Sequence, residues 1–280
     1  MFLSMGNSTQ SGYDLNDLRK LIDETDRDLL NLMEKRAQLA LAIGKLKGRN
    51  ANGFDGFYRP SREMHVLNKI VSHENSSLPK ITLIAIWREI ISSVLQMQSP
   101  FSVAICDDGS GDMRALARNQ FGISTPILPL ASPSQLFAAL ASKRVQLGLL
   151  AFPGKGPTGN WWLHLSAPYH VLAHLSSYPF QGTGQNALVI GQAAIEETGR
   201  DRSLIDFSCE QQLSCTHLCN VVREKGFAPS PLDAQEKGNR IHYLLQMEGF
   251  VEPNDPRFQE ISSVLPVEIR WIGAYACPLE

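Results

Sequence analysis

Several features that define other classes of protein are missing from this sequence of 280 residues. It has no run of 18 apolar residues, so we expect no membrane-spanning helix. Residues 1–14 lack the basic and long apolar regions of a signal peptide, and we expect them to form a disordered tail. The five cysteines have no disulfide-scaffold spacing, which favours a reducing compartment and predicts a cytoplasmic protein.

Strong charge and metal-ligand patterns are missing as well. The formal net charge is −2, which argues against a general nucleic-acid binder and confines any basic site to a local cluster. The group Cys209, Cys215, His217 and Cys219 fits no common zinc spacing. We therefore interpret these cysteines as ordinary buried thiols.

One long helix is predicted at the start of the ordered chain. From Leu15 to Lys47 the sequence has no proline and a single glycine, Gly44. Apolar residues recur in steps of four and three, which is a heptad seam on a helix of about 33 residues and about 50 Å. No small domain can cover such a rod, so we expect it to pack against helices of its own chain and of a second copy. The apolar seam residues are Leu18, Ile22, Leu29, Leu32, Leu39, Ile43 and Leu46.

Two shorter helices are predicted after it. The stretch GRNANGFDGF, rich in glycine and asparagine, ends the first helix. We predict a second helix over residues 60–73, with Pro60 at the first helical position, and a third over residues 81–98. The apolar stripe of the third helix ends with Gln98, which either reaches solvent at the helix end or belongs to a site.

Several polar side chains lie where packing alone does not favour them. Arg36 occupies the seam, and Lys47 lies about 20° from it around the helix axis. Arg62 lies in the first turn of the second helix, where a cation is disfavoured by about 0.3–1 kcal/mol. Arg36 could form a structural ion pair with an acid from another helix. Alternatively, these cations bind a small polyanion, with Glu63 and Gln98 beside them for its hydroxyl and ether oxygens.

The stretches LRKLIDETDRDLLNLMEKRAQLALAIGKLK, FYRPSREMHVL and IWREIISSVLQMQ together resemble the all-helical (AroQ-type) chorismate mutase family. The resemblance covers residues 15–99 and implies an all-α three-helix domain that forms an interlocked homodimer with two shared sites. It also implies that chorismate is the substrate and that no metal or organic cofactor takes part.

The resemblance assigns a role to each polar residue. Arg36 and Arg62 would bind the substrate carboxylates, together with an Arg19 supplied by the partner subunit, since Arg19 lies about 100° from Arg36 on its own helix. Lys47 and Gln98 would hydrogen-bond the ether oxygen, and Glu63 would hold the ring hydroxyl. Arg59 is counted among the substrate-binding residues, although some members carry an acid there. Val94 stands where a serine often contacts substrate, and the adjacent Ser93 points about 100° away.

Residues 101–195 are predicted to form an α/β lobe after a short linker at residues 99–101. Strands at 102–106, 125–130 and 145–152 alternate with helices at 111–121 and 132–144, which predicts a parallel sheet. Further strands are expected at 169–178 and 187–192. We interpret DDGSG, at residues 107–111, as a turn and not as a phosphate loop.

This order resembles a prephenate dehydratase fused behind a mutase, as in bifunctional P-proteins. Two departures imply a degenerate form. The second dehydratase lobe is largely missing between Pro153 and Gln185. The stretch GQNALVIG stands where the family has a threonine–arginine–phenylalanine motif before this strand.

Residues 198–280 follow the order strand–helix–strand–strand–helix–strand, which resembles the ACT domain that senses phenylalanine in P-proteins. The stretch APSPLDAQE replaces a glutamate–serine–arginine–proline segment of that family. We therefore prefer a structural or dimerising role for these residues to amino-acid sensing.

The sequence as a whole predicts a chorismate mutase of phenylalanine and tyrosine biosynthesis that carries a degenerate α/β dehydratase-like lobe and an α+β ACT-like domain. Dehydratase activity, nucleic-acid binding and membrane binding are not expected. Two alternatives stay open: a bifunctional chorismate mutase/prephenate dehydratase, and a non-catalytic regulatory subunit of an aromatic amino-acid pathway enzyme.

Overall fold

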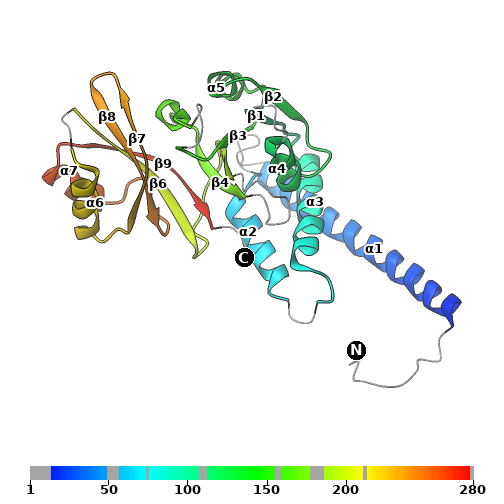
Figure 1. Ribbon diagram of the computed structural model, residues 1–280. Helices are drawn as coiled ribbons and strands as arrows, with labels where there is room; N and C mark the ends of the chain where they lie inside the picture. The colour runs from blue at the N-terminus through cyan, green and yellow to red at the C-terminus, as the bar shows by residue number, and fades with distance from the viewer. Residues whose placement is uncertain are drawn as a thin grey trace.

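The computed structural model describes residues 14–48, 57–73, 76–106, 112–154, 159–176, 186–210 and 213–277, and only the backbone of residues 47 and 48. The chain begins with three helices, α1 (Leu15–Gly48), α2 (Pro60–Val71) and α3 (Lys80–Gln98). Their bounds agree with the expected ones to within two residues. In Figure 1, α1 projects away from the rest of the molecule, and its N-terminal part extends beyond α2 and α3.

The apolar seam of α1 is exposed in the single chain. All seven of its leucine and isoleucine side chains, from Leu18 to Leu46, are between 43% and 67% exposed. A stripe of this kind on a soluble helix normally faces a core or a partner helix. The exposure agrees with the expected second copy, and the homodimer stays a prediction.

An α/β lobe follows the helices. Its elements are β1 (Val103–Cys106), α4 (Asp112–Phe121), β2 (Ile127–Leu130), α5 (Pro133–Ala141), β3 (Leu147–Ala151), the 3₁₀ turn η2 (Trp161–His164), β4 (His170–Ser176) and β5 (Asn186–Gly191). As expected, β1 pairs in parallel with both β2 and β3, whereas β5 runs antiparallel to β3 and β4. Ser132 caps α5 by accepting a hydrogen bond from the backbone N–H of Gln135 at 3.3 Å. The stretch DDGSG lies outside the described residues.

The remaining elements have the expected order. They are β6 (Asp201–Cys209), α6 (Cys215–Glu224), β7 (Pro229–Lys237), β8 (Arg240–Glu248), α7 (Arg257–Val264) and β9 (Glu268–Ala276). The neighbouring strands lie in the order β9-β6-β8-β7, the arrangement of a ferredoxin-like βαββαβ unit. Figure 1 shows α6 and α7 together on one face of these strands.

The lobe and the C-terminal unit share one sheet of nine strands, in the order β2-β1-β3-β5-β4-β9-β6-β8-β7. The two units join where β4 and β9 meet in parallel at Val171 and Gly273. Gly273 has φ +146°, and an added Cβ would lie 2.4 Å from the carbonyl oxygen of Val171. Only glycine therefore allows these two strands to approach each other.

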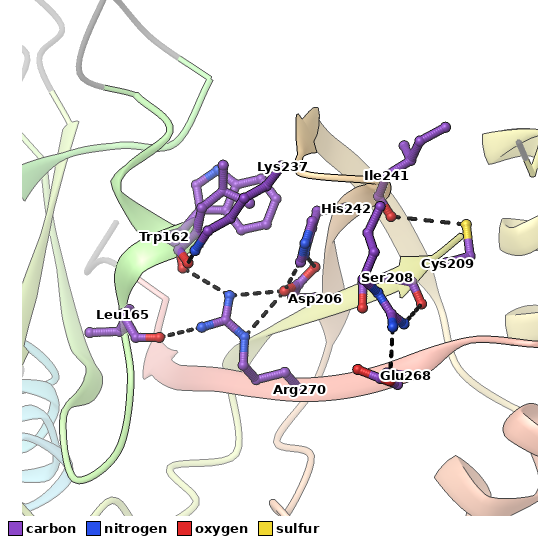
Figure 2. A network of polar contacts seen from close by, with 12 residues as sticks. Trp162, Leu165, Asp206, Ser208, Cys209, Lys237, Ile241, His242, Glu268 and Arg270 are labelled. Carbon is purple, nitrogen blue, oxygen red and sulfur yellow. Dashed lines mark hydrogen bonds and ion pairs between the residues drawn. The ribbon is translucent and has the colours of Figure 1, made fainter. Parts of the chain in front are cut away.

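A buried ionic network also ties the two units together (Figure 2). Asp206 on β6 is 2% exposed and accepts hydrogen bonds from Arg270 Nη2 at 2.9 Å and Nε at 3.2 Å. His242 Nδ1 lies 3.0 Å from the same carboxylate. Arg270 also donates to the carbonyl oxygens of Trp162 and Leu165, so it links the η2 segment of the lobe to β9. The buried carboxylate of Asp206 is thus paired with the guanidinium of Arg270, as a buried charge requires.

The helical domain and the lobe share a hydrophobic core. Tyr58 and Leu95 pack in one buried cluster with Phe101 and Phe121, and the rings of Tyr58 and Phe121 lie 6.0 Å apart. Phe101 is 3% exposed, so the segment expected as a linker is partly core. The lobe therefore packs directly on the helices that carry the expected site.

Membrane and metal features can be examined only in the described part of the chain. There, no helix combines the length and the hydropathy needed to cross a membrane. The same residues include no group of three or more histidine, cysteine or acidic side chains arranged to hold a metal ion. Cys209 and Cys219 are buried, as expected for ordinary thiols, and neither forms a disulfide.

Candidate functional site

A cleft of about 350 Å³ lies where the C-terminal half of α1, the start of α2 and the end of α3 meet. Five of the seven expected site residues line it: Arg36, Arg59, Arg62, Glu63 and Gln98. Apolar side chains such as Ile43, Val66 and Ile91 form much of the remaining wall. Among the described residues, no serine, cysteine or histidine side chain lines this cleft.

Two guanidinium groups in the cleft are available to an anion. Arg36 is half-buried, and burial lowers the pKa of its guanidinium. Arg62 is exposed in the first turn of α2, where the helix dipole disfavours a cation. Within the described residues, neither arginine forms an ion pair with an acid. The alternative interpretation of Arg36 as half of a structural ion pair therefore finds no support in this part of the chain.

Gln98 does not simply end α3 in solvent. Its side chain is half-buried, and its Nε2 donates a hydrogen bond to the carbonyl oxygen of Ala40 on α1. Gly44 lies one turn further along α1, and a Cβ added there would approach Gln98 Cγ to 2.9 Å. The missing side chain at Gly44 thus makes room for Gln98 between the two helices.

Glu63 lies between the cleft and the lobe. Its Oε1 accepts a hydrogen bond of 2.8 Å from Nε2 of Gln120 on α4. Burial raises the pKa of Glu63 to about 7, although Arg88 and the hydrogen bond from Gln120 both favour the charged form. Glu63 also lines a second, smaller cavity between the helices and β4. Its protonation state therefore changes near neutral pH.

Arg59 has a partner that the sequence did not predict. Its guanidinium forms an ion pair with Glu196, in the segment between β5 and β6. Glu196 is held in turn by Ser61, whose hydroxyl donates to the Glu196 carbonyl at 2.5 Å and accepts from the Glu196 N–H at 3.0 Å. The role of Arg59 in substrate binding stays a prediction.

The other expected residues lie as follows. Arg19 is exposed on the projecting part of α1 and does not line the cleft, which agrees with its expected role in a partner's site. The side chain of Lys47 lies outside the described residues.

Val94 is buried and lines the cleft, whereas Ser93 is exposed and donates to the carbonyl oxygen of Glu89 at 2.7 Å. The predicted difference in direction between Val94 and Ser93 is therefore confirmed.

Sequence reasoning missed Gln120 and Glu196. Gln120 does carry a signal, because it is a polar residue at helical spacing on the buried face of α4, after Met113, Leu116 and Ala117. The same signal drew attention to Gln98. Glu196 has no comparable signal, since it lies 137 residues from Arg59 in a segment without periodicity.

Residues 18–99 match the family model of chorismate mutase type II. Curated relatives include the bifunctional chorismate mutase/prephenate dehydratase of Pseudomonas aeruginosa, which is 30% identical over 138 residues, or 49% of this chain and 38% of the relative. The protein of the same name from Neisseria gonorrhoeae is 38% identical over 86 residues, or 31% of this chain and 22% of the relative. The chain thus aligns with well under half of the length of these relatives. The predicted resemblance to a mutase fused to a dehydratase is confirmed.

A solved structure shares the fold of much of the chain. That of GqqA, described as a novel type of quorum quenching acylase, superposes with a TM-score of 0.50 at 14% identity, covering 63% of this chain and 95% of GqqA. The prephenate dehydratase of Streptococcus mutans gives a TM-score of 0.48 at 12% identity, covering 63% of this chain and 98% of that protein. The order of the elements confirms the predicted fold class: an all-helical domain precedes an α/β lobe and an α+β unit.

Proposed function

We propose that this protein is a chorismate mutase, which isomerises chorismate to prephenate in the cleft between α1, α2 and α3. One observation carries the proposal: the guanidinium groups of Arg36 and Arg62 line a single cleft with the amide of Gln98, and no acid among the described residues pairs with either arginine. The match of residues 18–99 to the mutase family supports it.

The residue types suit this reaction. A C–O bond breaks as a C–C bond forms within one molecule, without proton transfer and without a covalent enzyme intermediate. The site must therefore orient the substrate, and arginines that bind its two carboxylates bidentately hold the enolpyruvyl arm over the ring. A nucleophile is not required.

The second requirement is to stabilise the charge that grows on the ether oxygen. A preorganised donor in a dry site lowers the barrier for such a step. Gln98 Nε2 carries two hydrogens, and its bond to Ala40 uses one, so the other is available for the ether oxygen. Lys47 supplies the charged donor, and Glu63 accepts a hydrogen bond from the ring hydroxyl.

We further propose that the active form is a homodimer. The exposed seam of α1 would pack against the helices of a second copy, and Arg19 would reach the partner's cleft. The 34-residue length of α1 supports this arrangement, because α2 and α3 have only 12 and 19 residues. Burial of the seam would remove the apolar stripe from water.

A bifunctional mutase/dehydratase is the second candidate, and the names of the curated relatives favour it. Against it stands the stretch GQNALVIG in place of the threonine–arginine–phenylalanine segment. We propose that the lobe does not dehydrate prephenate. A regulatory subunit without activity is the third candidate, and it gives no reason for two available arginines in one cleft.

One assay separates the three candidates. The purified full chain is incubated with chorismate at neutral pH, and prephenate and phenylpyruvate are scored separately. A mutase accumulates prephenate, with phenylpyruvate no higher than in an enzyme-free control, and Arg36→Ala abolishes the conversion. Enzyme-dependent phenylpyruvate would establish the bifunctional candidate. A folded protein that leaves chorismate unchanged would refute the mutase.

A further inference from the structure

The appended lobe reaches into the wall of the mutase cleft at one polar side chain. Gln120, on α4, donates from Nε2 to Oε1 of Glu63 at 2.8 Å. Resting on the function proposed above, we propose that Gln120 is a positioning residue for the mutase reaction. It orients the Glu63 carboxylate and keeps it available as the acceptor for the ring hydroxyl of chorismate.

The position of Gln120 is fixed by packing. The residue is 7% exposed and lies next to Phe121, which packs against Tyr58 and Phe101. The turn that follows α4 is held to α3, because the backbone N–H of Ile123 donates to Glu89 Oε1 at 3.0 Å. A side chain held in this way is a preorganised partner, which makes it suited to orient a carboxylate.

Charged and titratable groups surround Glu63 on several elements. They are Arg36 on α1, Tyr58 and Arg59 before α2, Arg62 on α2, Arg88 on α3 and His174 on β4. Burial lowers the pKa of His174 to about 4 and raises the pKa of Tyr58 well above its usual range, so both are neutral at pH 7. The arginines stay charged. Among these groups, Glu63 is therefore the one that titrates near neutral pH.

The direction of the effect follows from the donor. The N–H of Gln120 stabilises the carboxylate more than the neutral acid, so it lowers the pKa of Glu63 against the effect of burial. A carboxylate also accepts a stronger hydrogen bond from the substrate hydroxyl than a neutral acid does. kcat/KM should thus rise with pH through the pKa of Glu63, and loss of the donor should move this rise to higher pH.

The test uses Gln120→Met in the full chain, because methionine keeps the unbranched length and removes the donor. The pH dependence of kcat/KM reports the free enzyme. In the wild type we expect a midpoint near the pKa of Glu63, about 7. In the variant the midpoint should be higher by about one pH unit, because that is the size of the pKa change that one hydrogen bond to a charged group produces. At high pH, where Glu63 is ionised in both proteins, the difference in kcat/KM should shrink to the part that comes from the lost orientation of the carboxylate. Ser92→Ala is the matched control. Its hydroxyl donates to the backbone oxygen of Gln120 at 3.5 Å and, among the described residues, not to the Gln120 side chain, so its midpoint should stay at the wild-type value.

A second measurement needs no substitution of Gln120. In the wild type, the side-chain amide NMR signals of Gln120 should titrate with a midpoint near 7, and this titration should vanish in Glu63→Gln. An active Gln120→Met with the wild-type midpoint, or a Gln120 amide that does not titrate, would overturn the inference and leave the mutase proposal standing. An inactive wild-type protein would instead refute the mutase proposal, while the NMR titration would still test the contact.

Discussion

Gly44→Ala tests whether the fit between α1 and α3 positions Gln98 for catalysis. Gly44 is buried on α1, directly after the cleft-lining Ile43, and an added Cβ would lie 2.9 Å from Cγ, 3.2 Å from Cδ and 3.3 Å from Nε2 of Gln98. The first distance is shorter than carbon atoms tolerate, so the Gln98 side chain must move. Its hydrogen bond to Ala40 would then be strained or lost.

The expected change in stability is small because two terms oppose each other. Alanine in place of glycine inside a helix stabilises by about 0.5–1 kcal/mol. Loss of the Gln98–Ala40 hydrogen bond costs about 0.5–1.5 kcal/mol. The free energy of unfolding should therefore change by less than about 1 kcal/mol, so the fold persists while the donor is displaced.

The expected change in activity is large by comparison. Displacing one preorganised donor from a developing negative charge reduces kcat by about 10²-fold. KM should change much less, since in the proposed mechanism Gln98 contacts the ether oxygen and not the substrate carboxylates. The assay is initial rates of chorismate loss, with denaturant unfolding of the same samples.

A double-mutant cycle gives the control. If Gly44→Ala acts through Gln98 alone, it should have no further effect on kcat in a Gln98→Ala background. A Gly44→Ala protein with the wild-type kcat would mean that the position of Gln98 does not matter to the reaction. Equal losses in both backgrounds would mean that Gly44 acts by another route.

Three further predictions follow from the same structure. In Gln98→Glu, an ionised carboxylate would repel the charge that develops on the ether oxygen, whereas the protonated acid can donate a hydrogen bond to it. The ratio of variant to wild-type kcat should therefore rise as pH falls, and a ratio independent of pH would contradict the placement of Gln98. Leu29→Glu combined with Leu32→Glu places two charges in the exposed seam, so light scattering should show a monomer. Its activity should be at least about tenfold lower because the partner's Arg19 is lost, and a fully active monomer would refute the shared site. Asp206→Ala removes a carboxylate that is 2% exposed and that accepts from Arg270 and contacts His242, so chemical denaturation should show a free energy of unfolding lower by about 3 kcal/mol. A decrease below about 1 kcal/mol would show that the network contributes little to stability.

Helix positions and much of the site follow from local chemistry. The bounds of α1, α2 and α3 depend on apolar periodicity, on Pro60 and on the turn residues between helices, all of which operate over a few residues. Arg36 and Gln98 stand out in the same periodicity, because each is a polar residue in an apolar stripe. The structure then brings both into one cleft with Arg62 and Glu63.

The α/β part was predictable for a similar reason. Alternating strand and helix patterns from 102 to 152 leave few topologies open, and the parallel pairing of β1 with β2 and β3 is the favoured one. The continuation of this sheet into the C-terminal unit was not predictable. It depends on the approach of Val171 and Gly273, which are about a hundred positions apart along the chain.

The sequence by itself thus determined which residues form helices and strands, and which polar side chains stand out on them. Only the tertiary structure decided what those side chains meet. Gln120 lies 57 residues from Glu63, and Glu196 lies 137 residues from Arg59, so no local period relates them. The tertiary structure also decides the pKa of Glu63, because burial under the lobe, and not the neighbouring sequence, raises it to about 7. Desolvation and contact are properties of packed surfaces, and a surface exists only once the chain has folded.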